Sequence, residues 1–178
     1  LFPEMFAPLE HSIIGRARKN GLIDFQTIFL RDFAINDYGQ VDDAPYGGEP
    51  GMVLRPEPLA QAIRSTGVRE NKGTVIYLTA DGQPLTHQIA KELSEKEHLV
   101  LVCGHYKGID ERIRESEIDM EISIGDFVVS GGELPAMVLT DAVGRLLEGA
   151  LGNKESGETD SFAQGLLGWP VYTRPEVF

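Results

Sequence analysis

The second half of the chain alternates short apolar runs with stretches of helical period. Continuous apolar runs bounded by turn residues predict buried strands, whereas apolar residues three or four positions apart predict helices. Strands are predicted at 74–79, 99–103, 121–124 and 127–130, and helices at 86–96, 110–115 and 135–148. Strands that alternate with helices predict an α/β fold whose mostly parallel sheet carries helices on both faces.

The first half is less regular. Helical spacing predicts a helix at 10–20 and a short one at 59–65, and alternating apolar positions predict a strand at 24–30. Residues 36–58 hold four glycines and four prolines, which predicts a long glycine-rich loop. An aromatic residue and Met52 within it favour an ordered loop, and such loops are usually functional.

Composition is that of a globular domain, with 178 residues, 42% of them hydrophobic, and no apolar run of the roughly 20 residues that span a bilayer. The single Cys103 lies in an apolar run and is expected to be a buried, reduced thiol in a cytoplasmic protein. A net charge of −12 argues against a nucleic-acid partner, since phosphate contacts need clustered cations. Residues 16–19, with two arginines and a lysine, are a candidate local patch or simply a solvated helix face.

Several familiar chemistries lack their signatures. The chain has no GxGxxG, GxxxxGK[ST], HExxH or paired CxxC motif, and its four histidines lack metal-ligand spacing. We therefore expect no dinucleotide fold, P-loop or metal site. Instead, glycine-rich segments at 80–82, 104–108 and 131–132 follow predicted strands. Ligands of parallel sheets bind at this edge, so a ligand cradle is favoured over three unrelated tight turns.

For two polar residues beyond this edge, local structure alone is a sufficient explanation. Arg145 lies near the end of the 135–148 helix, where a cation suits the helix dipole. Asp160 belongs to the polar stretch 154–162 and would serve equally as a linker residue or, like Ser161, as a helix N-cap.

A set of motifs, in this order and spacing, closely resembles the bacterial tRNA (guanine-N1)-methyltransferases of the SPOUT superfamily, which modify the guanine 3′ of the anticodon. The motifs lie at 41–48, 108–112, 123–126, 131–137, 160–162 and 172–175. The resemblance implies S-adenosylmethionine as methyl donor, tRNA as substrate and a deep trefoil knot as the cofactor site. It also implies a homodimer whose active site is shared between subunits.

The resemblance divides the chain into a knotted catalytic domain at 1–152, a linker at 153–163 and the start of a C-terminal tRNA-binding helical domain at 164–178. It marks Asp160 as general base and Arg145 as the residue that orients guanine, with Asp42, Gly51 and Ser156 near the target base. The residues implied for the cofactor come from four segments of the chain: Tyr77, Leu78, Thr79, Gly104, Tyr106, Ser123, Ile124, Gly125, Phe127, Val129, Gly131, Gly132 and Pro135.

These roles make coherent chemistry. Asp160 would accept the proton of guanine N1 as N1 attacks the methyl group, and Arg145 would stabilise charge developing on O6. The sulfonium methyl is already electrophilic, and whether Mg²⁺ assists RNA binding or proton transfer stays open. The alternatives are a knotted methyltransferase acting on another RNA base or on ribose, and a noncatalytic cofactor- or RNA-binding module.

Three residues depart from the family pattern. His105 and Lys107 stand where the family usually has Arg and Glu, and Glu49 replaces a usual glycine. Lys107 reverses a charge near the methionine end of the implied cofactor.

Overall fold

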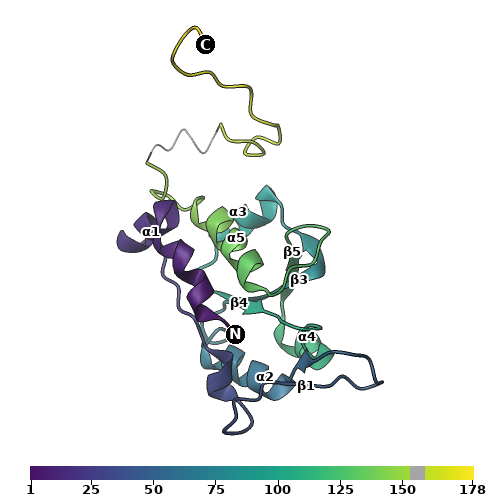
Figure 1. Cartoon of the computed structure of the whole chain (residues 1–178). Coiled ribbons are helices and arrows are strands. Elements are labelled where there is room, and N and C mark those ends of the chain that lie inside the picture. Colours follow the sequence, from purple (N-terminus) through teal and green to yellow (C-terminus); the bar gives the residue numbers. More distant parts are fainter. Residues whose placement is uncertain (153–158) are drawn as a thin grey trace.

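The computed structural model describes residues 1–152 and 159–178. Its sheet has three parallel strands in the order β4 (Leu99–Cys103), β3 (Thr74–Pro84), β5 (Met120–Ser123) (Figure 1). β3 pairs with β4 from Thr74 opposite Leu99 to Leu78 opposite Cys103. The predicted α/β class with a parallel sheet is confirmed.

Side chains of the central strand β3 alternate between two cores. Val75 and Tyr77 pack on one face with residues of α2 (Pro56–Ser65) and α4 (Glu111–Glu117). Ile76 and Leu78 pack on the other with α3 (His87–Ser94) and α5 (Glu133–Gly144). Burial on both faces explains why these strands are continuously apolar in sequence.

Helix ends follow local sequence signals. The Thr86 hydroxyl accepts a hydrogen bond from the Ile89 amide and caps α3, and Asp110 caps α4 by accepting from the Arg112 amide. The predicted helix at 10–20 is α1 (Ser12–Lys19), preceded by the 3₁₀ helix η1 (Pro3–Glu10). A second 3₁₀ helix, η2 (Leu30–Phe33), follows later.

The predicted loop at 80–82 is wrong in detail, because β3 continues to Pro84 through an irregularity. Leu78 and Gln83 both pair with Ile122, so residues 79–82 bulge out of the ladder. Gly82 permits this close passage, since a Cβ there would lie 2.6 Å from the backbone nitrogen of Ile122. The long loop at 36–58 likewise contains a short antiparallel pair, β1 (Asp42–Asp43) with β2 (Val53–Leu54).

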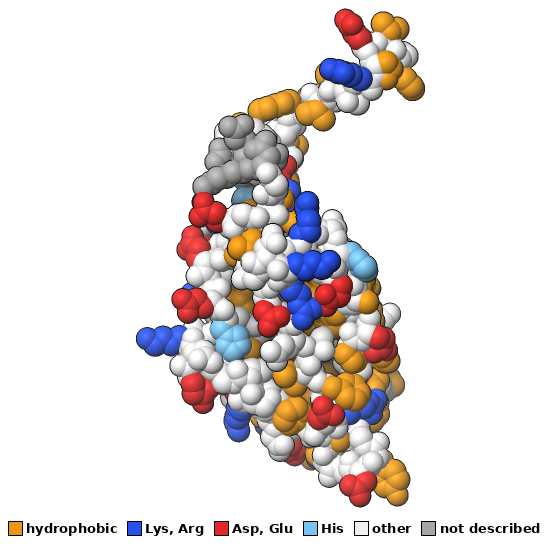
Figure 2. Space-filling model, turned by 90° about the vertical axis from the view of Figure 1, so that its left-hand side faces the viewer, with side chains coloured by type: hydrophobic (Ala, Val, Ile, Leu, Met, Phe, Trp, Pro, Cys, Tyr) orange, Lys and Arg blue, Asp and Glu red, His pale blue; other side chains and the backbone are white. Residues whose placement is uncertain are grey.

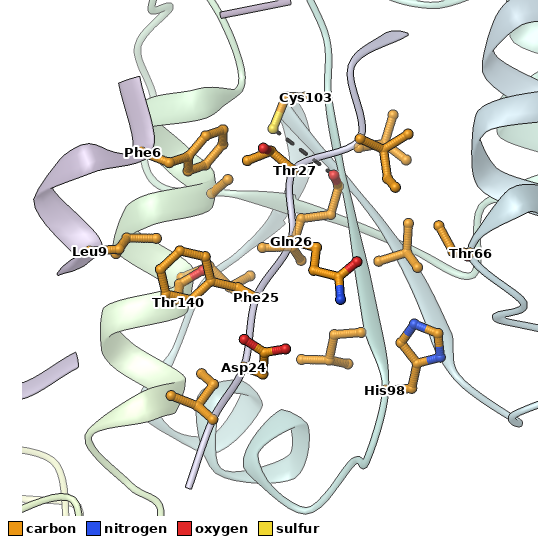
Figure 3. A pocket seen from close by; sticks show the side chains of 18 of the residues that line it. Phe6, Leu9, Asp24, Phe25, Gln26, Thr27, Thr66, His98, Cys103 and Thr140 are labelled. Atoms are coloured by element: carbon orange, nitrogen blue, oxygen red, sulfur yellow. Dashed lines mark hydrogen bonds between the residues drawn. The ribbon is translucent and has the colours of Figure 1, made fainter. Parts of the chain in front are cut away.

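Two predicted strands are wrong. Residues 127–130 form no ladder, although Gly131 makes an isolated bridge with His105. Residues 24–29 are also outside any ladder. They lie across a cavity of about 670 Å³ from β4, with Phe25, Gln26 and Thr27 on one wall and Cys103 on the other (Figure 3). Alternation is sufficient for a strand only where a partner edge lies within hydrogen-bonding distance.

Residues 159–178 consist of turns and extended chain without a helix. Figures 1 and 2 show this segment projecting from the body. The helix start suggested at Asp160 or Ser161 is therefore not formed, and the domain division stays a prediction. The large apolar side chains of the 159–178 segment are exposed, including Leu166, Trp169 and Tyr172.

The surface bears on two further expectations. Arg18 of the candidate basic patch forms ion pairs with Glu10 and Asp24 and lies over the Phe25 ring, 4.3 Å from its centre. Acidic and basic side chains are interspersed on the face in Figure 2, with no large area of one sign. Among the described residues, none of the helices combines the length and apolarity that crossing a bilayer requires.

Candidate functional site

A cavity of about 170 Å³ lies at the edge of the sheet where β4 and β5 end and the β3 bulge begins. Three segments line it: residues 77–80 of β3, residues 104–108 after β4, and residues from the 122–132 segment at and after the end of β5. Every residue that the sequence marks for the cofactor lines this cavity, from Tyr77 to Pro135. The edge of the sheet that parallel topology favours for ligands is thus the edge that the glycine-rich loops enclose.

Direct backbone contact joins two of these loops. The Gly132 amide donates to the Gly104 carbonyl over 2.9 Å, and His105 bridges to Gly131 in antiparallel fashion. Glycine is required for this proximity, because a Cβ on Gly132 would lie 2.5 Å from the Cα of Cys103. At these positions the glycines serve loop-on-loop packing, and the cavity results from that packing.

The lining suits an adenosyl group. Tyr106 and Phe127 both line the cavity and are 53% and 55% exposed, so their rings are accessible to a purine. Residues 128–130 line the cavity outside any helix or strand, so backbone groups there can approach a ligand. A volume of 170 Å³ is below the roughly 300–1,000 Å³ usual for ligand pockets, so a whole cofactor would extend over the exposed rings.

An ion network not found from the sequence supports the cavity floor. Arg114 of α4 bonds both carboxylate oxygens of Glu121, at 2.6 and 2.7 Å, and reaches Asp81 in the β3 bulge at 2.9 Å. Its guanidinium lies 5.8 Å from the centre of the Tyr77 ring, whose phenol pKa is raised by burial. Only the bulge brings Asp81 to α4, so no local pattern could have indicated this network.

The loop assigned to the target base adjoins the cavity. The Lys107 amide donates to the Met52 carbonyl, and the Leu54 amide donates to the Gly108 carbonyl. Gly51 has a φ of +111°, and the Lys107 side chain crosses it, 2.9 Å from where a Cβ would lie. Asp42 is half-buried in β1 opposite Leu54.

Arg145 and Asp160 come together away from the cavity. The Arg145 Nη2 donates to Asp160 Oδ2 over 2.6 Å, with 40% and 43% of the side chains exposed. Arg145 caps the C-terminal end of α5, whereas Gly132 at the other end lines the cavity. A rise of about 1.5 Å per residue separates the two helix ends by about 20 Å. Ser156 lies outside the described residues.

Two further expectations concern metal-binding clusters and the protonation of Cys103. Over residues 1–152 and 159–178, no cluster of three or more metal-binding side chains is found. Burial raises the pKa of Cys103 to about 12, so this side chain is a thiol at neutral pH.

Known proteins similar to this chain share one description. The model of the family described as tRNA (Guanine-1)-methyltransferase TrmD matches residues 1–178. A Staphylococcus aureus tRNA (guanine-N(1)-)-methyltransferase is 52% identical over 179 residues, spanning 100% of this chain and 73% of the relative. Its Clostridium beijerinckii counterpart is 51% identical, spanning 100% and 74%.

A solved structure agrees with these sequence matches. The tRNA (m1G37) methyltransferase of Aquifex aeolicus superposes with a TM-score of 0.82 and 40% identity, covering 99% of this chain and 74% of that one. With a family match over all its residues and this cavity at the end of its sheet, the chain belongs to the tRNA (guanine-N1)-methyltransferase family.

Proposed function

We propose that this chain transfers a methyl group from S-adenosylmethionine to N1 of guanine 37, the guanine 3′ of the anticodon in tRNA. The observation that carries the proposal is the Arg145–Asp160 ion pair. On guanine, the N1–H donor and the O6 acceptor are adjacent, so a neighbouring carboxylate and guanidinium complement both at once.

Each member of the pair has a separate task. Asp160 accepts the N1 proton as N1 attacks, because the protonated nitrogen has no lone pair to offer the methyl group. Arg145 donates one Nη2 hydrogen bond to Asp160, and its guanidinium carries further N–H donors that would bond O6, where negative charge develops. The planar guanidinium thereby fixes the carboxylate relative to the base.

The cofactor is held by groups at the cavity. The rings of Tyr106 and Phe127 would contact the adenine, and backbone groups at 128–130 would bond its polar edge and the ribose. Bound there, S-adenosylmethionine supplies a methyl group made electrophilic by its sulfonium. The loops at 104–108 and 123–135 would form the deep trefoil knot of the family, which the Gly104–Gly132 contact supports.

The active site would be shared between the subunits of a homodimer. About 15 Å of α5 separates Pro135, which lines the cavity, from Arg145, and Asp160 is bonded to that arginine. Within one chain, the base and the methyl donor therefore lie too far apart for in-line transfer. Exposed apolar side chains on the cavity loop and on α5, at Val128, Leu134 and Val138, support contact with a second copy.

The test is methylation of unmodified tRNA carrying guanine 37, followed by nuclease digestion and mass spectrometry of the nucleosides. We expect one 1-methylguanosine per tRNA and none when position 37 is adenine. Methylation of ribose or of another base would support a different knotted methyltransferase. Absence of transfer despite cofactor binding would support a noncatalytic module.

A further inference from the structure

Glu133 stands out because its carboxylate is buried. It is the first residue of α5, its side chain is 1% exposed, and it lies behind the cavity at the end of the sheet. Taking a carboxylate out of water is costly unless it is paired and hydrogen-bonded. The contacts that compensate this cost therefore say what Glu133 does.

The main partner is His105. Its Nε2 lies 2.8 Å from both Glu133 oxygens, and its ring packs 5.3 Å from the centre of Phe2. The backbone nitrogen of Leu1 also donates to Glu133 Oε1 over 3.1 Å. The position of Glu133 in the first turn of α5 adds a favourable interaction with the helix dipole.

His105 belongs to one cofactor loop and Glu133 to the other. His105 follows Gly104, whereas Glu133 follows Gly131 and Gly132. A Cβ on Gly131 would lie 2.3 Å from the His105 ring and 2.6 Å from Glu133 Oε2. The ring and the carboxylate are therefore stacked over Gly131, where the two backbones bridge.

We propose that Glu133 is a positioning residue of the cofactor site, which acts through His105 to hold the 104–108 loop against the 128–132 loop. This inference rests on the proposed use of S-adenosylmethionine. Glu133 does not line the cavity, but residues on both loops do, including Tyr106 and Val129. Losing the Glu133 carboxylate would let the two walls separate and would lower cofactor affinity without removing a side chain that lines the cavity, whereas His105 itself lines it.

A purely structural role makes a different prediction. If Glu133 and His105 only stabilised the fold, their substitution would lower the free energy of unfolding but leave the affinity of the folded protein for the cofactor unchanged. The dissociation constant of S-adenosylmethionine therefore separates the two roles.

The experiment measures that constant by calorimetry for the wild-type chain and for E133Q, H105Q, H105R and the E133Q/H105Q double variant. We expect about tenfold weaker binding by E133Q and by H105Q, and no further loss in the double variant, because one contact is removed in each case. H105R should bind about as tightly as wild type, since a guanidinium also donates to the carboxylate. Circular dichroism at the assay temperature establishes that each variant is folded.

Exposed Glu115 provides the matched control, because E115Q makes the same chemical change away from the cavity. Binding within about twofold of wild type by folded E133Q and H105Q would overturn the inference. If E133Q does not fold, the H105Q and H105R pair decides alone: weak binding by the first and rescue by the second support the contact. If the wild-type chain itself does not bind S-adenosylmethionine, the proposed cofactor is wrong and the inference falls with it.

Discussion

Arg145 and Asp160 form an ion pair of 2.6 Å across a sequence separation of fifteen residues. Arg145 is positioned by the end of α5, and Asp160 lies in the turns that begin the 159–178 segment. Both side chains keep two fifths of their surface exposed, so a base can reach either of them. Under the proposed function, this pair is the unit that recognises guanine.

Removing the general base should stop methyl transfer without affecting cofactor binding. Asp160→Asn keeps the size of the side chain but cannot accept the N1 proton, so we expect methyl transfer to fall by about 10²- to 10⁴-fold. Cofactor affinity should be unchanged, because Asp160 does not line the cavity. Single-turnover assays and calorimetry measure the two quantities, with exposed Asp141→Asn as control. Normal turnover by D160N would refute the assignment.

A shared active site predicts complementation between two inactive variants. D160N lacks the general base but retains an intact cavity. Val129→Trp is designed to fill the cavity but retains Asp160. When they are co-expressed and assemble at random, half of the dimers are mixed and each has one complete site, which predicts about a quarter of wild-type activity. Calorimetry must first establish that V129W does not bind cofactor. Activity no higher than that of the separate variants would contradict sharing.

The close packing of the two loops predicts that a single methyl group added at Gly132 lowers the free energy of unfolding. Gly132→Ala would place a Cβ 2.5 Å from the Cα of Cys103, which is backbone and cannot rotate away. We expect a loss of about 1–3 kcal/mol in the free energy of unfolding, measured in urea. Gly152→Ala has nothing within 4 Å of its new atom and should be nearly neutral. Equal effects of both substitutions would show that the contact is easily relieved.

The α3 cap predicts a smaller and purely local effect. Thr86→Ala removes the acceptor for the Ile89 amide and should cost about 1 kcal/mol of unfolding free energy. Thr86→Ser retains the hydroxyl and should restore most of the loss. Cofactor binding should not change in either variant, since Thr86 does not line the cavity. If the cap does not stabilise α3, all three proteins will have the same free energy of unfolding.

Glu133 predicts a pH dependence of stability. Burial acts to raise the Glu133 pKa, but it is outweighed by hydrogen bonds, chiefly from His105 and the backbone, which lower that pKa below the ordinary 4.5. A lowered carboxyl pKa contributes stability that is present above pH 4.5 and is lost as the pH falls through the folded-state value. The stability difference between wild type and E133Q should therefore be largest near neutrality and shrink towards pH 4. A difference that grows on acidification would have the wrong sign.

Sequence patterns with a local cause agreed well with the structure. The continuous apolar run at 75–78 became a buried strand because both faces of the sheet are covered there, whereas in the run at 99–103 only Val102 is buried. Thr86 caps its helix through contacts within one turn. The cofactor loops could be located from strand ends and glycines, and the resemblance supplied the individual residues. All of them share one cavity because parallel strands end at a common edge.

Only the tertiary structure decided contacts between distant segments. Residues 24–29 alternate like a strand but find no hydrogen-bonding edge, and the β3 bulge carries Asp81 to Arg114. The sequence by itself determined periodicity, turns and caps, because these depend on neighbours a few positions apart. The pairing of His105 with Glu133 depends instead on how the loops cross at the end of the sheet, which no local pattern records.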